Sequence, residues 1–374
     1  MNNDFLDLIQ KLALKMIFIF TKPFKELKIK KTQKDLLITK YEKTNENLII
    51  FLTSGYDMVN GGILSINSIY DETKKLKDLH QSEVILCTVP GEPLLLKYTK
   101  FKNQNWIYNF SDILLHFKDL KCLMIHIPEY ACGNFLRSIS NREQSILNHI
   151  ENLHVNILIQ NIDIAMDNFK DIQNLKNRFE KVTCTTAHEN YSNIRNRQKF
   201  DIPLHKLSVY ASPEQYIYKT YDEKKELIII SHDEHPKKKK VLKSLQEEFP
   251  NIKIQIIKNM TYNEFKTTIS EAKWALTFGE GLDGYFVETI FSGGISFSVY
   301  NHRFFTKDFS SLETVYSDYD ELIQKMPLDL RRLNKKNAFE IYQKKQFMLC
   351  SKYYDHKEYI KNLKLFYQGD YTYK

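Results

Sequence analysis

Two carboxylates and an unusual concentration of glycine mark one stretch of this chain. Glu280 and Glu288 stand eight residues apart, and the stretch that contains them holds five of the eleven glycines in the sequence. These five are Gly279, Gly281, Gly284, Gly293 and Gly294. Glycine adopts positive φ readily and lets the backbone come close to a ligand. The pattern therefore predicts a loop that approaches a bound group such as a phosphate, with two carboxylates beside it.

The elements around these residues are those of a parallel sheet. An apolar run at residues 274–278 stops at the glycine-rich loop, and a short helical segment follows it. Gly293 and Gly294 end that segment, and a second apolar run begins at Ile295. This order of strand, loop, helix and strand is the unit from which parallel sheets are built.

The same alternation runs through most of the chain. Continuous apolar runs are typical of strands that are buried on both faces. They predict further strands at residues 47–53, 83–89, 120–127, 155–162, 181–185, 207–210, 226–230 and 252–257. Helical spacing predicts helices at residues 238–249 and 262–272. We therefore expect an α/β protein with two successive Rossmann-like halves, which 374 residues can accommodate.

The sequence divides into four predicted parts. Residues 1–44 form a basic, amphipathic helical extension, and residues 45–218 form the first Rossmann-like domain. A polar segment at residues 219–225 opens the second domain, which we expect to span residues 219–345. Residues 346–374 are predicted to be C-terminal helices that pack back on the first domain.

Polar residues follow the ends of the predicted strands in both domains. In open parallel sheets, ligands bind beyond the carboxyl ends of the strands. The residues in such positions are Gly61 and Gly62, His126 to Glu129, His188, Ser231 and His232, and Glu280 to Glu288. Because they come from both halves, we expect the site to lie in the cleft between the two domains, where small-molecule sites are common. The apolar neighbours of His126 favour a core histidine at that position instead.

The stretch from Glu280 to Glu288 resembles a known family signature. It matches the E-x7-E motif of GT-B glycosyltransferases and is close to glycosyltransferase family 4. In that family the motif follows a strand, and a pair of small residues leads into the next strand, as Ser292-Gly293-Gly294 does here. Weaker similarities are found at Gly61-Gly62, at residues 185–213, and at residues 312–326 and 330–347. The resemblance thus covers about residues 47–347 and implies the GT-B fold, with two Rossmann-like domains facing each other across a cleft.

The resemblance also implies roles for individual residues. Glu280 would bind hydroxyl groups of a donor sugar as a catalytic residue, and Glu288 would bind ribose hydroxyls of the nucleotide. An ionised carboxylate suits both roles, because charged acceptors make the stronger hydrogen bonds. The backbone at Gly281, Asp283 and Gly284 and the helix N-terminus behind it would face the diphosphate. Asp283 stands where the family usually has a glycine, and Gly284 follows one place later.

Positive charge near the diphosphate is expected just after the first strand of the second domain. His232 stands where the family has an arginine, and Lys237 and Lys238 follow it. The lysines are also typical of a solvated helix start. His188 is a second catalytic candidate that would line the cleft, although an ordinary loop histidine fits the sequence equally. Gly61 and Gly62 would form the acceptor-side loop, or only a turn.

The function that the resemblance implies is transfer of a sugar from a nucleotide-sugar donor to a glycan or lipid-linked acceptor. Retention of anomeric configuration and a role in bacterial capsule or lipopolysaccharide synthesis are expected from the same family. Two alternatives stay open, namely a nucleotide-sugar epimerase on the same fold and a non-catalytic GT-B-like binding subunit.

Several other chemistries find no support in the sequence. It has no G-x-x-x-x-G-K-[ST] loop, no G-x-S-x-G elbow and no His/Cys cluster with metal-ligand spacing. The D-x-D at Asp318 and Asp320 lies at a predicted helix start and is interpreted as a cap. We expect no obligatory metal or cofactor, with the nucleotide sugar as substrate, and no nucleic-acid partner, because no recognition signature is present.

Charge and cysteine usage predict the compartment. The net charge of +8, from 54 basic and 46 acidic residues, favours anionic partners or reflects a biased genome. The five cysteines lack CxxC spacing, and no signal peptide is evident, so a cytoplasmic protein with free thiols is expected. No apolar run reaches the roughly 18 residues that span a bilayer. Residues 1–31 are amphipathic and rich in lysine, which predicts either a helix packed on the first domain or a peripheral contact with an anionic membrane surface.

Overall fold

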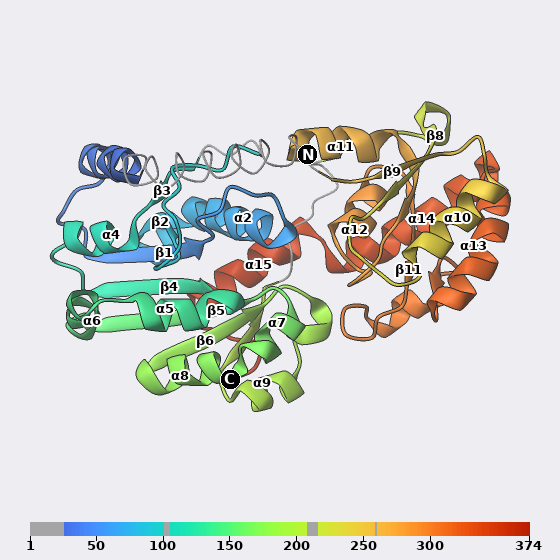
Figure 1. The fold of residues 1–374 in the computed structure, drawn as a ribbon. Helices are drawn as coiled ribbons and strands as arrows, with labels where there is room; N and C mark the ends of the chain where they lie inside the picture. Colours follow the sequence, from blue (N-terminus) through green and yellow to red (C-terminus); the bar gives the residue numbers. More distant parts are fainter. Residues whose placement is uncertain (1–25, 101–104, 208–215, 259) are drawn as a thin grey trace, which may run out of the picture.

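A computed structural model describes residues 26–100, 105–207, 216–258 and 260–374 of the chain. Two parallel sheets, each surrounded by helices, form two domains that lie side by side (Figure 1). This is the α/β, two-domain arrangement that the sequence predicts. The predicted amphipathic segment at residues 1–25 lies outside the described residues, and residues 26–40 are helical.

The N-terminal domain contains a seven-stranded sheet in the order β3-β2-β1-β4-β5-β6-β7. Its strands are β1 (Asn47–Thr53), β2 (Glu83–Thr88), β3 (Ile107–Tyr108), β4 (Cys122–Pro128), β5 (Asn152–Ile159), β6 (Lys181–Thr186) and β7 (Leu204–Lys206). Its helices are α2 (Gly61–Lys75), α3 (Lys77–His80), α4 (Phe110–His116), α5 (Cys132–Ser138), α6 (Asn141–Asn148), α7 (Ile162–Asp167), α8 (Phe169–Arg178) and α9 (Ile194–Phe200).

The C-terminal domain contains a five-stranded sheet in the order β12-β11-β10-β8-β9. Its strands are β8 (Lys225–Ile230), β9 (Lys253–Ile256), β10 (Ala272–Leu276), β11 (Ile295–Val299) and β12 (Val315–Tyr316). Its helices are α10 (Lys238–Glu248), α11 (Tyr262–Glu271), α12 (Gly284–Phe291), α13 (Tyr319–Leu333) and α14 (Lys336–Tyr353). All paired strands in both sheets run parallel.

Alternate residues of the central strands bury opposite faces of the first sheet. In β1, Ile50 and Leu52 pack into a core with α4, α5 and α8, whereas Ile49 and Phe51 pack into a second core with α2. Because both faces are covered, the strand has no polar side and appears in the sequence as an unbroken apolar run.

The C-terminal helix α15 (His356–Tyr367) returns to the N-terminal domain. Tyr359 and Leu363 join the core that Ile49 and Phe51 form with α2. The predicted boundary at residues 345 and 346 falls inside α14, which continues as one helix to Tyr353. The chain leaves the C-terminal domain only in the short link before α15.

Two short strands of the first sheet, β3 and β7, lie outside the predicted strand ranges. β3 has only two residues and gives no periodic signal, and β7 precedes the strand expected at residues 207–210. Residues 208–215 lie outside the described part of the chain. Asp318 caps α13 by accepting hydrogen bonds from the backbone N–H groups of Asp320 and Glu321, as its sequence position predicts.

Each sheet has one point at which the strand order reverses. In the N-terminal domain it lies between β1 and β4, and in the C-terminal domain it lies between β8 and β10. Ligands of open parallel sheets bind in the crevice outside the carboxyl ends of the strands at such a point. The loops after β1, β4, β8 and β10 are therefore the places to look for a site.

Candidate functional site

The loop after β10 is held in one conformation by buried hydroxyl groups. Thr277 Oγ1 donates a hydrogen bond to the carbonyl of Gly281 at 2.8 Å, and Ser231 Oγ, at the end of β8, accepts one from the N–H of Phe278 at 3.0 Å. Gly281 has φ of +83°, and a Cβ there would lie 2.7 Å from Ser298 Oγ. This position therefore requires glycine, both for its positive φ and for the close packing around it.

Glu280 leaves this loop toward the N-terminal domain. Its Oε1 accepts a hydrogen bond from the side-chain amide of Asn161, which stands at the N-terminus of α7. Burial raises the pKa of Glu280 to about 7, opposed by the Asn161 hydrogen bond and reinforced by the nearby Asp233 and Asp163. Glu280, the first glutamate of the motif, thus forms a direct hydrogen bond with the N-terminal domain.

Glu288 lies on α12 in a different environment. Its Oε1 is 3.5 Å from the hydroxyl of Tyr262, and its Oε2 is buried without a hydrogen-bond partner among the described residues. Burial raises the pKa of Glu288 to about 8, while hydrogen bonds from Tyr216 and Tyr262 act in the opposite direction. A buried carboxylate oxygen without a hydrogen-bond donor is energetically unfavourable. A ligand hydroxyl placed there would donate the missing hydrogen bond.

Asp283 occupies the N-terminus of α12. Its side chain accepts a hydrogen bond from the N–H of Phe286 at 3.0 Å, as an N-cap residue does. Burial raises the pKa of Asp283. Gly284 is the first residue of the helix, and a Cβ there would lie 3.4 Å from Glu288 Oε1. A diphosphate bound at this helix N-terminus would therefore compete with the Asp283 carboxylate for the backbone N–H groups of the first turn.

The predicted cations after β8 are engaged elsewhere. Lys237 forms a 2.6 Å ion pair with Asp320 at the start of α13. Lys238 is 6% exposed, and its ammonium donates to the carbonyls of Ser231 and Asp233, which closes the loop after β8. His232 is exposed, with its Nδ1 3.4 Å from the hydroxyl of Tyr285.

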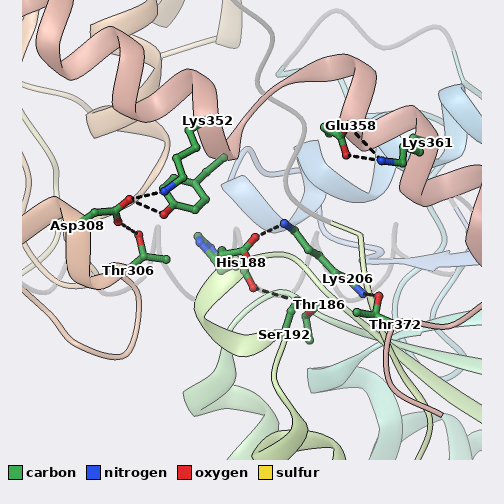
Figure 2. Close-up of polar contacts among 12 residues, drawn as sticks. Thr186, His188, Ser192, Lys206, Thr306, Asp308, Lys352, Glu358, Lys361 and Thr372 are labelled. Carbon is green, nitrogen blue, oxygen red and sulfur yellow. Dashed lines mark hydrogen bonds and ion pairs between the residues drawn. The ribbon is translucent and has the colours of Figure 1, made fainter.

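His188 lies just past β6, at the contact between the domains. It lines a small cavity together with Leu282, Phe304 and Tyr354 of the other half of the chain. Its Nδ1 is buried without a partner in the described structure, and burial lowers its pKa to about 4. Figure 2 shows His188 between the pair formed by Asp308 and Lys352 and the side chain of Lys206.

Gly61 and Gly62 form the first turn of α2, directly behind the loop after β1. Asn60 caps this helix by accepting a hydrogen bond from the N–H of Ile63. Gln160, at the end of β5, donates to the carbonyl of Gly62 at 2.9 Å. A Cβ on Gly62 would lie 2.9 Å from Gln160 Oε1, whereas Gly61 faces open space.

Two residues connect this side of the cleft to Glu280: Glu129, which the sequence places in the group after the strand ends, and Asn161, which the sequence does not single out. Glu129 follows β4, is 1% exposed, and accepts a hydrogen bond from the N–H of Asn161 at 2.9 Å. Its Oε2 is buried without a partner among the described residues. Burial raises the pKa of Glu129 to about 7, with Glu280 as one of the smaller contributors. Asn161 therefore contacts a carboxyl group of each domain.

Two further contacts join the domains beside this pair. Arg303 forms an ion pair with Asp163, and the side chain of Asn190 donates to the carbonyls of His302 and Arg303 at 2.6 and 2.9 Å. The loops after β10 and β11 thus lie against α7 and the turn after β6. No group of three or more His, Cys, Asp or Glu residues that could hold a metal ion is found in the described part of the chain.

Several solved structures have the same overall architecture as this chain. Sucrose-phosphate synthase from Thermosynechococcus elongatus has a TM-score of 0.56 at 8% identity, covering 86% of this chain and 98% of its own. Anabaena HepE in complex with UDP-glucose has a TM-score of 0.54 at 9% identity, covering 86% and 99%. A glycosyltransferase from Rickettsia africae has a TM-score of 0.52 at 10% identity, covering 87% and 99%.

These similarities define the fold. The chain has the GT-B fold, with two Rossmann-like domains. No protein-family model and no curated protein matches the sequence. At identities of 10% or less, the structural likeness describes the backbone, and the chemistry has to be argued from the side chains of this chain.

Proposed function

We propose that this protein is a glycosyltransferase that uses a nucleotide-sugar donor. The observation that carries the proposal is the position of Glu280 and Glu288 around the N-terminus of α12, at the reversal point of the second sheet. The unpartnered Oε2 of Glu288 fits a hydroxyl-bearing ligand. One GT-B neighbour adds support, since HepE binds UDP-glucose and UDP in its crystal structures.

In the proposed complex the C-terminal domain holds the donor. Glu288 accepts hydrogen bonds from the ribose hydroxyls and Glu280 from those of the sugar, while the loop before α12 and His232 face the diphosphate. The acceptor hydroxyl, bound between the domains near Gly61 and His188, attacks the anomeric carbon. The bond to the diphosphate breaks, and the departing diphosphate oxygen takes the acceptor proton. Such front-face substitution retains configuration and relies on positioning and charge stabilisation.

We place the acceptor among glycans or lipid-linked glycans of a bacterial surface polysaccharide, by analogy with the family that the motif resembles. The described part of the chain has no helix long and apolar enough to cross a bilayer. We propose a cytoplasmic enzyme that works peripherally at the membrane, and no step of the proposed reaction uses a metal.

Thermal-shift screening against UDP, GDP, CMP and their sugars tests the proposal and identifies the donor. We expect one nucleotide diphosphate and its sugar to raise the melting temperature. Glu280→Ala and Glu288→Ala should then abolish transfer while circular dichroism stays unchanged. Glu247→Ala, an exposed glutamate on α10, is the matched control and should remain active.

The outcome also separates the alternatives. An epimerised nucleotide sugar formed from donor alone would identify an epimerase. Absence of binding to every nucleotide would favour the non-catalytic subunit. Full transfer activity in Glu280→Ala would refute the assignment of the donor site to this loop.

A further inference from the structure

A cluster of lysines surrounds a tryptophan on the outer edge of the N-terminal domain. The ammonium of Lys97 lies 4.0 Å from the centroid of the Trp106 ring, and that of Lys40 lies 5.7 Å from it. Lys74, on α2, is close enough to act electrostatically on Lys40. We call these four residues the Trp106 surface.

Within the described part of the chain, the three lysines of this surface form no ion pair. No carboxylate of the described residues is within ion-pair distance of the three ammonium groups. Asp71, the acid that interacts electrostatically with Lys74, is hydrogen-bonded to Asn105. The pKa of Lys40 is lowered first by burial and then by repulsion from Lys74 and Lys97. Two ammonium groups over one ring, with a third close enough to repel Lys40, favour an anion as their partner.

The fold places this surface away from the candidate active site. Trp106 directly precedes β3, the edge strand of the seven-stranded sheet, and Lys40 ends the helix at residues 26–40. That helix, dark blue in Figure 1, lies on the side of the N-terminal domain opposite the C-terminal domain. A large partner can therefore contact this edge without blocking the cleft.

We propose that the Trp106 surface binds the phosphate groups of an anionic lipid bilayer. Lysine is attracted to anionic lipid as a strongly hydrated point charge, and a partly exposed tryptophan settles at the level of the headgroups. The neighbouring helix adds exposed lysines at Lys28, Lys30, Lys31 and Lys34. None of the cations in the surface is an arginine, the residue that reads nucleic acid best, which favours a bilayer over DNA or RNA.

The intrinsic fluorescence of the full-length protein gives a local test. The chain has two tryptophans, and Trp274 is 0% exposed inside the C-terminal domain. A shift in emission therefore reports on Trp106. Phosphatidylglycerol vesicles should shift the emission to shorter wavelength and sediment the protein, whereas phosphatidylcholine vesicles should do neither. Trp106→Phe should abolish the spectral shift.

Charge removal tests the lysines. Each lysine near an anionic bilayer is worth about fivefold in affinity, so Lys40→Gln, Lys74→Gln and Lys97→Gln together should weaken vesicle binding about 100-fold. The matched control replaces three exposed lysines of α10 with glutamine, namely Lys239, Lys240 and Lys243. That variant should bind within a fewfold of the wild type.

Four results would overturn the proposal. An equal shift with inorganic phosphate alone would mark a site for free anions, and an equal shift with a DNA duplex would mark a nucleic-acid surface. Vesicle binding without any change in Trp106 emission would place the contact elsewhere, for example in residues 1–31. Undiminished vesicle binding by the triple lysine variant would show that these ammonium groups do not contribute to membrane binding.

Discussion

At the scale of single residues, the ionisation of the Glu288 carboxyl group should couple binding of the proposed nucleotide-sugar donor to proton release. Its pKa is about 8 in the ligand-free protein, so it is largely protonated at pH 6 and ionised above pH 8. The proposed hydrogen bonds from ribose hydroxyls favour the ionised form, because a carboxylate accepts them more strongly than a carboxylic acid. Donor binding should therefore release a proton below pH 8.

This linkage predicts that affinity for the cognate nucleotide rises with pH. Between pH 6 and pH 8 the increase should approach about tenfold per pH unit and then level off, since one proton is released per ligand below the pKa. Calorimetry in buffers of different ionisation enthalpy measures both affinity and proton release. Glu288→Gln should bind more weakly and lose most of the pH dependence. Unchanged proton release in that variant would assign the proton to another group.

The sequence predicts only part of the site at this scale. Glu280 and Glu288 are close in sequence, so spacing and glycine content find them. Glu129 appears in the sequence only as one of several residues after strand ends, and Asn161 gives no signal. Asn161 bonds both Glu129 and Glu280, and the strand order and the docking of the two domains bring these residues together. Likewise, nothing in the run of lysines after β8 reveals that Lys238 turns inward to bind carbonyl groups.

At the scale of elements, the turn from α12 to β11 requires glycine at one position. Gly293 has φ of +86°, and a Cβ there would lie 2.2 Å from the carbonyl oxygen of Lys219. Gly293→Ala should lower the free energy of unfolding by about 2 kcal/mol or more, since positive φ alone costs an alanine about 1–2 kcal/mol. Urea unfolding measures the change. Gly61→Ala, where no atom lies within 4 Å, is the control and should be neutral or slightly stabilising. Equal effects at both positions would contradict this reasoning.

The docking of α15 depends on neutral histidines. His126, His154 and His205 surround the ring of Phe366 from three strands. His154 donates or accepts a hydrogen bond with Thr183 at 2.8 Å, and His205 contacts the carbonyl of Asn362 on α15. Burial lowers the pKa of each of the three, to about 3 for His154.

These shifts predict that acid loosens the C-terminal helix. The unfolded chain binds protons at these histidines below about pH 6.5 and the folded chain does not, so stability present above pH 6.5 is lost as pH falls. For His154 alone the loss should reach about 2 kcal/mol at pH 5, at about 1.4 kcal/mol per pH unit. Hydrogen exchange should show faster exchange in α15 at pH 5 than at pH 7 after correction for the intrinsic rate. His154→Gln should reduce this difference, and His149→Gln, an exposed site on the same domain, should not.

Sequence patterns predict elements well where burial is complete. β1 appears as an unbroken apolar run because helices cover both its faces, and its predicted bounds match. β3 and β7 are too short to show an alternating pattern of apolar residues. In β7 the polar residues His205 and Lys206 also interrupt any apolar run. The packing position of α15 depends on residues of distant strands. The sequence of α15 alone therefore does not predict which residues of the first domain it contacts.

At the scale of the whole molecule, polar contacts hold the two domains together near the site. The side chain of Asn190 donates two hydrogen bonds to carbonyls of the loop after β11, and Arg303 pairs with Asp163. Contacts of this kind are typical of interfaces that open and close. They lie next to the hydrogen bond between Asn161 and Glu280, so Glu280 is covered when the domains are closed.

Removal of these contacts should therefore open the cleft. Asn190→Ala with Arg303→Ala deletes three interactions of about 1 kcal/mol each, which shifts the ratio of closed to open molecules about 100-fold toward the open form. Small-angle scattering should show a larger radius of gyration while circular dichroism stays unchanged. Arg332→Ala removes a pairing within the C-terminal domain alone and should leave the scattering curve as it is. Because an open cleft exposes Glu280, the double variant should also bind the nucleotide faster. An unchanged radius together with an unchanged association rate would mean that these contacts do not govern closure.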